Sequence, residues 1–375
     1  MITGPEIDDF VKTDDPGRLA MASRYYLRTA PLTIEPHERP EDTDLLRVFR
    51  AGLSASVASI FGPRRENSSK GLVRASAIEG GAKADLHHAA TNAHRLLFPR
   101  PHEGPDRCVE LMTADCSDAH RAFLKQAHGV TFNSSPSYLG MDRAESKDWD
   151  FLYSLSENAR PTLFHENPLW YLPGNAPDKY QGQTGYFYHA LAEPHWSFWR
   201  EWYQGFLDGT PLDWELQRCV ATIPDAEWAM GPGHIAKLIE EIRARFALER
   251  RVADLEEELK ASAISRHSLG GNFPPEPIDP PGIAKELLII WEPLQDLKAE
   301  LEAEKPDEDR IRKALALLAD ALKAGLAWCA KKADLAGDTT IKWAIPAGGT
   351  GYFALNPEKL SAVIDGVQTW LGILP

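Results

Sequence analysis

The feature that most constrains this chain is the segment 195–261, which carries five of its 11 tryptophans. Pro194 precedes the segment, at a position where a helix tolerates a residue without an N–H donor. Aromatic side chains then recur at spacings of three and four, so they share one face of a helix. This face consists of Trp196, Trp199, Trp202, Tyr203 and Phe206. Because each ring removes about 150–250 Å² from water, we expect this face to form a core or an interface.

The alternative role for such a face is a stacking platform for bases or sugars. Base stacking accompanies a basic groove, whereas the neighbouring charges here are acidic: Glu193, Glu201, Asp208, Asp213 and Glu215. The whole chain of 375 residues has a formal net charge of −14 and no dense run of Lys and Arg. Since phosphate binding needs a basic surface, composition argues against nucleic acid as a main partner.

The pattern of apolar residues divides the chain into four parts. Residues 1–43 are predicted to be an irregular leader, and residues 44–264 a helical main domain with an aromatic-rich loop region at 130–190 and a Trp-rich helix and a long charged helix at 194–264. A Pro/Gly linker follows at 265–282, and residues 283–375 form the C-terminal part. No run of alternating residues is long enough to build a sheet. The predicted fold class is therefore mainly α.

The C-terminal part is predicted to be an antiparallel helical hairpin followed by an amphipathic tail helix. The first helix has an apolar face of Leu287, Ile290, Trp291, Leu294, Leu297 and Leu301, and the second one of Ile311, Leu315, Leu318, Leu322, Leu326 and Cys329. The turn at 305–307 carries Pro and Asp, which suit the start of a helix. Alternating spacings of four and three favour packing like that of a coiled coil.

The tail, residues 338–375, admits two interpretations. Its apolar side carries Leu360, Val363, Ile364, Val367, Trp370 and Leu371. An amphipathic helix of this kind usually packs on a domain, but one beside a glycine-rich, charge-poor segment could instead lie on a membrane surface. Candidate interaction residues are therefore Leu360, Ile364, Val367, Trp370 and Leu371, together with the five aromatic residues of the Trp-rich helix.

A polar cluster between residues 85 and 128 is the main candidate for chemistry. It comprises Asp85, His87, His88, His94, Asp115, Cys116, Asp118, His120 and His128. Mixed His and carboxylate ligands are typical of metal sites, but these spacings fit no established motif. We therefore predict no metal and no cofactor. A Cys116/His120 nucleophile pair, or an enzyme site with Glu166 and His189, stays an alternative whose catalytic residues the sequence does not identify.

Cysteine use and the first residues predict a reducing, cytoplasmic location. The four cysteines are scattered and form no C-x-x-C pair. The first 15 residues are acidic where a signal peptide would be basic. No run of 18 apolar residues occurs, so we expect no ordinary membrane span, although the tail leaves a membrane-peripheral location open.

Residues 193–335 resemble a group of uncharacterised bacterial proteins, which we associate with alphaproteobacteria. The resemblance rests on W-x-x-W-x-x-W-Y-x-x-x-L-x-G-x-P-L-D from Trp196, on I-P-D-x-x-W-x-x-G-P from Ile223, and on a linker that ends in N-F-P-P-E. That linker is a degenerate form of an HNNPPE-like one. The resemblance implies no activity.

Three hypotheses of function follow from the sequence. The first is a non-enzymatic helical scaffold or assembly protein that binds a protein partner or a second copy of itself. The second is a membrane-active effector, of the toxin or phage-defence type, that acts through the tail. The third is a metal- or histidine-dependent enzyme that uses the polar cluster at 85–128.

Overall fold

The computed structural model describes residues 16–33, 41–62, 82–97, 109–116, 118, 139–155, 160–170, 178–264, 285–303, 305–332, 343–347, 351–355 and 357–374. These residues are mainly α-helical, as predicted. Contacts divide the chain into two compact units. We call residues 4–239 the N-terminal unit and residues 240–375 the C-terminal unit.

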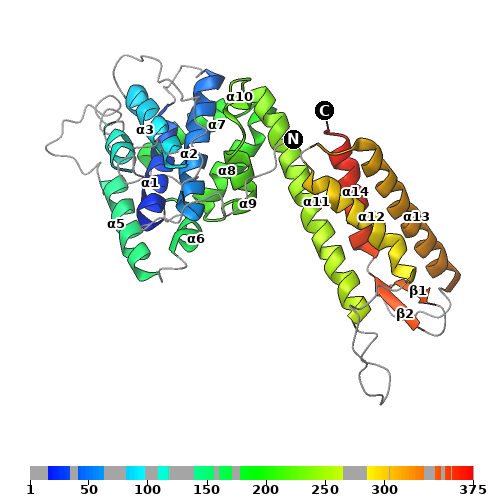
Figure 1. The fold of residues 1–375 in the computed structure, drawn as a ribbon. Helices are drawn as coiled ribbons and strands as arrows, with labels where there is room; N and C mark the ends of the chain where they lie inside the picture. The colour runs from blue at the N-terminus through cyan, green and yellow to red at the C-terminus, as the bar shows by residue number, and fades with distance from the viewer. Residues whose placement is uncertain are drawn as a thin grey trace. The chain divides into compact units, whose positions relative to one another are not determined.

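The N-terminal unit is a packed set of helices, most of them short (Figure 1). Its elements are α1 (Pro16–Thr29), η2 (Ala30–Thr33), α2 (Asp42–Phe61), α3 (Ala82–Leu97), helical residues 109–116, α5 (Leu139–Ser154), α6 (Arg160–His165), α7 (Asp178–Ala190), η4 (Pro194–Trp196), α8 (Ser197–Asp208), α9 (Trp214–Ala221), α10 (Asp225–Trp228) and the start of α11 (Pro232–Ile264). Helix α2 lies at its centre and contacts α1, α3 and α9.

Small side chains allow α2 to be buried on nearly all sides. Fourteen of its 20 residues are buried, most of them Ala, Ser, Gly or Val. A Cβ atom at Gly52 would lie 3.1 Å from Cη2 of Trp202 and 3.3 Å from a ring carbon of Tyr26. The Ala-rich composition therefore brings neighbouring helices close to α2.

The prediction of an irregular leader at 1–43 is wrong for residues 16–33. These residues form α1 and η2, and most of their side chains are buried, including Arg24 and Arg28. The polar composition suggested an exposed segment, because buried arginines are rare unless they are paired. Residues 1–15 lie outside the described part of the chain.

The prediction of an aromatic loop region at 130–190 is also wrong over much of its length. Helices α5, α6 and α7 occupy most of the residues that the structure describes there. Helix α5 begins at Leu139, and Tyr153 near its end is 72% exposed. Pro, Gly and Asn between short helices gave the segment the composition of a loop.

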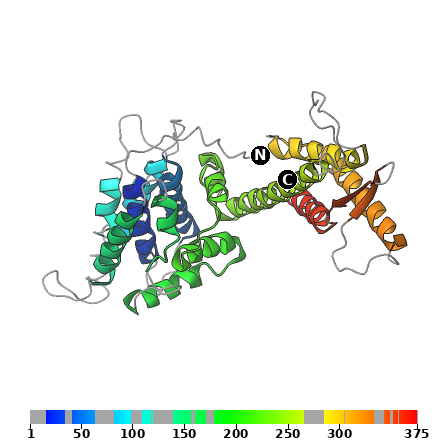
Figure 2. The same ribbon diagram turned by 90° about the horizontal axis from the view of Figure 1, so that it is seen from below.

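The C-terminal unit contains the rest of α11, α12 (Lys285–Glu302), α13 (Glu308–Lys332), α14 (Pro357–Leu371) and a β-hairpin. Helices α12 and α13 contact each other, and α14 lies along α13 (Figures 1 and 2). The carboxylate of Asp307 accepts from the N–H groups of Asp309 and Arg310, so it caps α13 as the sequence suggested. The hairpin pairs β1 (Trp343–Ala347) with β2 (Gly351–Leu355) antiparallel, a small sheet that the sequence did not predict.

The boundary between the units falls inside α11 and not at the predicted linker. Residues Leu248, Val252, Leu255 and Leu259 of α11 are buried in one core with residues of α12, α13 and α14. The second half of the long charged helix therefore belongs to the C-terminal unit, because its apolar stripe is needed to complete that core. The predicted linker, 265–282, lies outside the described residues.

Candidate functional site

The five aromatic residues proposed as a contact surface lie in the interior of the N-terminal unit. Trp196, Trp199, Trp202, Tyr203 and Phe206 are each 0–1% exposed. The rings of Trp199, Trp196 and Trp202 lie around Phe49 of α2, with centroids 5.1, 5.8 and 6.2 Å from its own. Of the two roles expected for this face, the structure shows a core within one chain.

Two polar side chains of this aromatic core, Trp202 and Tyr203, make internal hydrogen bonds. The indole N–H of Trp202 donates to Oε1 of Gln217 at 2.8 Å, and Nε2 of Gln217 donates to the carbonyl of Leu212 at 2.7 Å. The hydroxyl of Tyr203 donates to the carbonyl of Leu27 at 3.3 Å. Burial raises the pKa of Tyr203, so the phenol stays neutral. These contacts fix α8 to α1 and α9.

The apolar side of the tail helix is also buried. Leu360, Ile364, Val367 and Trp370 are 0–6% exposed in the core of the C-terminal unit, and Leu371 packs partly buried against it. Nζ of Lys359 lies 3.0 Å from Oε2 of Glu258, and Nη1 of Arg251 donates to the carbonyl of Ala362 at 2.9 Å. Helix α14 is thus docked on α11 by both apolar and polar contacts.

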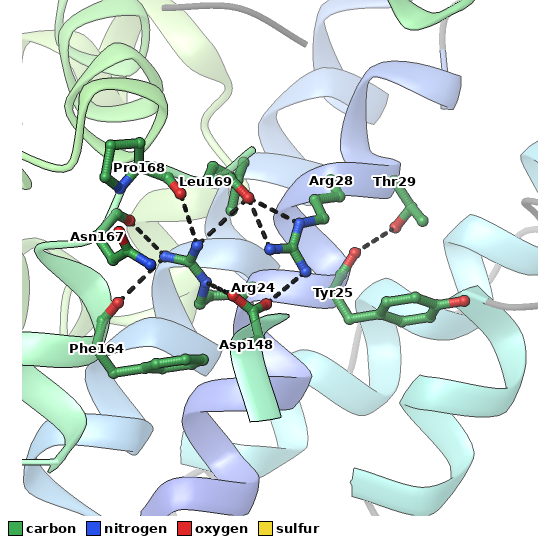
Figure 3. A network of polar contacts seen from close by, with 9 residues as sticks. All are labelled: Arg24, Tyr25, Arg28, Thr29, Asp148, Phe164, Asn167, Pro168 and Leu169. Carbon is green, nitrogen blue, oxygen red and sulfur yellow. Dashed lines mark hydrogen bonds and ion pairs between the residues drawn. The ribbon is translucent and has the colours of Figure 1, made fainter. Parts of the chain in front are cut away.

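The most elaborate polar arrangement in the N-terminal unit joins Arg24 and Arg28 to Asp148 (Figure 3). Nε of Arg24 lies 3.2 Å from Oδ1 of Asp148, and Nη1 of Arg28 lies 2.6 Å from Oδ2. All three side chains are 0–1% exposed. We call these three residues the arginine network.

Backbone carbonyls complete the coordination of both guanidinium groups (Figure 3). Arg24 donates from Nη1 to the carbonyls of Phe164 and Asn167 and from Nη2 to those of Pro168 and Leu169, at 2.7–3.3 Å. Arg28 donates twice more to the Leu169 carbonyl. The last carbonyls of a helix lack partners within it and attract cations. The arginine network therefore secures the end of α6 and the turn that follows it.

Every N–H donor of Arg24 already has an acceptor within the fold. A guanidinium carries five such donors, and they reach Asp148 and the four carbonyls of residues 164–169. A ligand carboxylate or phosphate would have to displace these contacts in a fully buried place. The arrangement has the properties of a structural connection between α1, α5 and the end of α6.

The polar cluster at 85–128 is not assembled into a metal site by the residues whose side chains the structure describes. Among them, no three His, Cys, Asp or Glu side chains come together as ligands. His88 is exposed, and Oδ2 of Asp115 accepts from Nδ2 of Asn92 at 2.8 Å. The side chains of Asp85, His87 and His94, and all of His120 and His128, lie outside the described part.

Cys116 does not have the properties of an active nucleophile. Its thiol is fully buried, and burial raises its pKa to about 12. Because the thiolate is the reactive form, this cysteine is inert at neutral pH. The proposed partner, His120, is outside the described residues.

The other two residues proposed for catalysis, Glu166 and His189, are both exposed. The sequence analysis did not identify His165, which directly precedes Glu166. His165 is fully buried at the end of α6, and its Nε2 lies 2.8 Å from Oγ of Ser59 in α2. Sequence reasoning also missed Arg24 and Arg28. Their spacing of four, in a segment that also contains the apolar residues Leu19, Tyr26 and Leu27, was a signal that they share a helix face.

Comparisons of the chain with protein-family models, with curated proteins and with solved structures found no match. The resemblance of residues 193–335 to a bacterial protein group therefore stays a prediction. No described helix has a stretch long and apolar enough to pass through a bilayer.

Proposed function

We propose that the chain is a non-enzymatic helical assembly protein, and that α13 provides the surface through which two copies associate. The observation that carries this proposal is the surplus of apolar surface on α13. One stripe, Ile311, Ala314, Leu318 and Ala321, is buried in the core of the C-terminal unit. A second stripe, Leu315, Ala319, Leu322 and Leu326, lies beside it and is only partly covered.

The second stripe has the spacing of a coiled-coil seam. Its residues follow each other at intervals of four, three and four, which keeps them on one side of a helix that packs lengthwise against another. Leu326 is 51% exposed. We call Leu315, Ala319, Leu322 and Leu326 the α13 seam.

We take a second copy of the chain as the partner of the α13 seam. A two-fold pair uses the same surface on both copies, so one seam is sufficient.

The membrane alternative requires a larger rearrangement. The apolar side of α14 is the side buried in the C-terminal core, so it would have to leave that core before it could contact lipid. The α13 seam is already partly exposed and needs no such step, which is why we place assembly first.

Light scattering on the purified full chain tests the proposal, with Leu326→Glu as the disruptive variant. We expect a dimer for the unaltered chain and a monomer for Leu326→Glu, because a carboxylate would be buried in the interface. Leu317→Glu is the matched control: Leu317 is 45% exposed and lies on the opposite side of α13, about two and a half turns away. This variant should stay dimeric.

Other outcomes of the same measurement point to the other hypotheses. A monomeric unaltered chain at concentrations up to the solubility limit contradicts the proposal. Binding to anionic liposomes that is lost on deletion of residues after Gly337 would favour the membrane hypothesis. A monomeric chain that does not bind liposomes would favour the third hypothesis, an enzyme that uses histidines of the 85–128 region.

A further inference from the structure

His165 occupies a position where four helices meet in the N-terminal unit. It is the last residue of α6 and is fully buried. Its Nε2 lies 2.8 Å from Oγ of Ser59 in α2. Its ring centroid is 5.5 Å from that of Phe206 in α8 and 5.3 Å from that of Trp214 in α9. The side chain therefore connects α6 to three other helices.

The hydrogen bonds of Ser59 determine which ring nitrogen carries the proton. A serine hydroxyl has a single proton to donate, and Oγ of Ser59 lies 2.6 Å from the carbonyl of Ser56, which can only accept. Ser59 therefore donates to Ser56, and Nε2–H of His165 donates to Ser59. This leaves Nδ1 as the unprotonated nitrogen, and Nδ1 is buried without a hydrogen-bond partner.

The charged groups around the ring come from α1 and α5. Arg24 in α1 opposes a positive charge on His165, and Asp148 in α5 favours one. Asp148 is already shared by Arg24 and Arg28, so the arginine network carries one excess positive charge. The contacts from α2, α8 and α9 are uncharged: Ser59, Phe206 and Trp214. The adjacent carboxyl, Glu166, is exposed.

We propose that His165 is an acid-sensitive contact of the N-terminal unit. Protonation would place a new N–H at Nδ1 without an acceptor and a second excess positive charge among aromatic rings. Both changes disfavour the folded arrangement. The consequence is release of α6, and of the turn that the arginine network holds, from α2 and α9.

The direction of the pH effect follows from the lowered pKa of His165. Burial, and then Arg24, lower this pKa from its ordinary value to about 3. The unfolded chain therefore binds a proton at a higher pH than the folded chain does. The contribution of His165 to stability is complete above its ordinary pKa of about 6.5 and is lost as the pH falls from there toward 3. By this linkage the folding equilibrium constant falls about 30-fold between pH 7.5 and pH 5.

Denaturant unfolding of the full chain at pH 7.5 and pH 5, at constant ionic strength, tests the proposal with His165→Gln. The amide of glutamine can donate to Ser59 as Nε2 does, but it does not titrate. We expect the unaltered chain to lose about 30-fold more in its folding constant than this variant does. His189→Gln, at an exposed histidine in the same unit, is the matched control and should keep the unaltered pH dependence. Equal losses in the unaltered chain and His165→Gln would overturn the proposal.

A second measurement covers the case in which His165→Gln does not fold. Nitrogen NMR of the histidine-labelled, unaltered chain reports tautomer and protonation state directly. We expect His165 to be the Nε2–H tautomer and to remain neutral at pH 5. A His165 signal that titrates near its ordinary pKa would overturn the proposal.

Discussion

The two units of this chain have interiors of different chemistry. The N-terminal unit has an aromatic core around Phe49 and contains three fully buried charged side chains of the arginine network. The C-terminal unit has an aliphatic core of leucine, valine and isoleucine with Trp370, and the ion pairs described in it have at least one partly exposed member. The spacing of aliphatic residues predicts which side chains pack in the core of the C-terminal unit. The buried charges of the N-terminal unit pair with residues that are distant in the sequence, so spacing does not predict those pairs.

One of the largest expected effects of a single substitution is at the buried carboxylate Asp148. Asp148→Asn should lower the free energy of unfolding of the N-terminal unit by about 3–5 kcal/mol, because two buried guanidinium groups would lose the carboxylate that both contact. Denaturant unfolding followed by circular dichroism measures this change. Glu308→Gln, which breaks an exposed pair with Arg312, is the control and should cost at most about 0.5 kcal/mol. Similar losses of unfolding free energy in the two variants would show that the buried carboxylate of the N-terminal unit contributes no more than an exposed one of the C-terminal unit.

Replacing both arginines and Asp148 by apolar residues is a sharper version of the same test. Such replacements of buried ion pairs are often neutral. Here the guanidinium groups also satisfy the carbonyls of Phe164, Asn167, Pro168 and Leu169. The triple variant should therefore stay destabilised. Recovery of full stability would show that the carbonyl contacts contribute little.

Truncation of one core residue in each unit should act within that unit. Trp202→Ala should cost about 3–5 kcal/mol and Leu297→Ala about 2–5 kcal/mol, because each leaves a cavity at a fully buried position. Hydrogen exchange followed by mass spectrometry localises the effect: faster exchange should be confined to the unit that carries the substitution. Acceleration of both units by either variant would mean that they unfold as one.

The smallest expected losses of stability come from Gly→Ala substitutions. They differ between Gly209 in the N-terminal unit and Gly366 in the C-terminal unit. Gly209 has φ +75°, and a Cβ atom there would lie 2.5 Å from the carbonyl oxygen of Glu166. Gly209→Ala should therefore cost about 1–3 kcal/mol. A Cβ atom at Gly366 would meet only side-chain ends of Leu248 and Arg251, at 3.0 Å, so Gly366→Ala should cost less. Thermal unfolding compares the two, and a larger loss for Gly366→Ala would contradict this ranking.

Much of the fold could be predicted from sequence where apolar periodicity was long and uninterrupted. The hairpin of α12 and α13, the tail helix and the long charged helix were predicted close to their observed positions. Prediction was wrong in the leader and in the aromatic region, where the helices are short and polar residues lie inside. The sequence grouped the five aromatic residues on one helix face, which the structure places in the core, and it did not identify Arg24, Arg28, Asp148 or His165.

The sequence by itself indicated where the long amphipathic helices form, because a spacing of three and four places apolar side chains on one face whatever that face contacts. Only the tertiary structure decided what those faces contact. It buried Trp199 against Phe49 within the same chain, and it brought Arg24 to Asp148, 124 residues later in the sequence. It also divided α11 between two units. The physical reason is that burial and ion pairing depend on neighbours in space, and local periodicity carries no information about which distant segments become those neighbours.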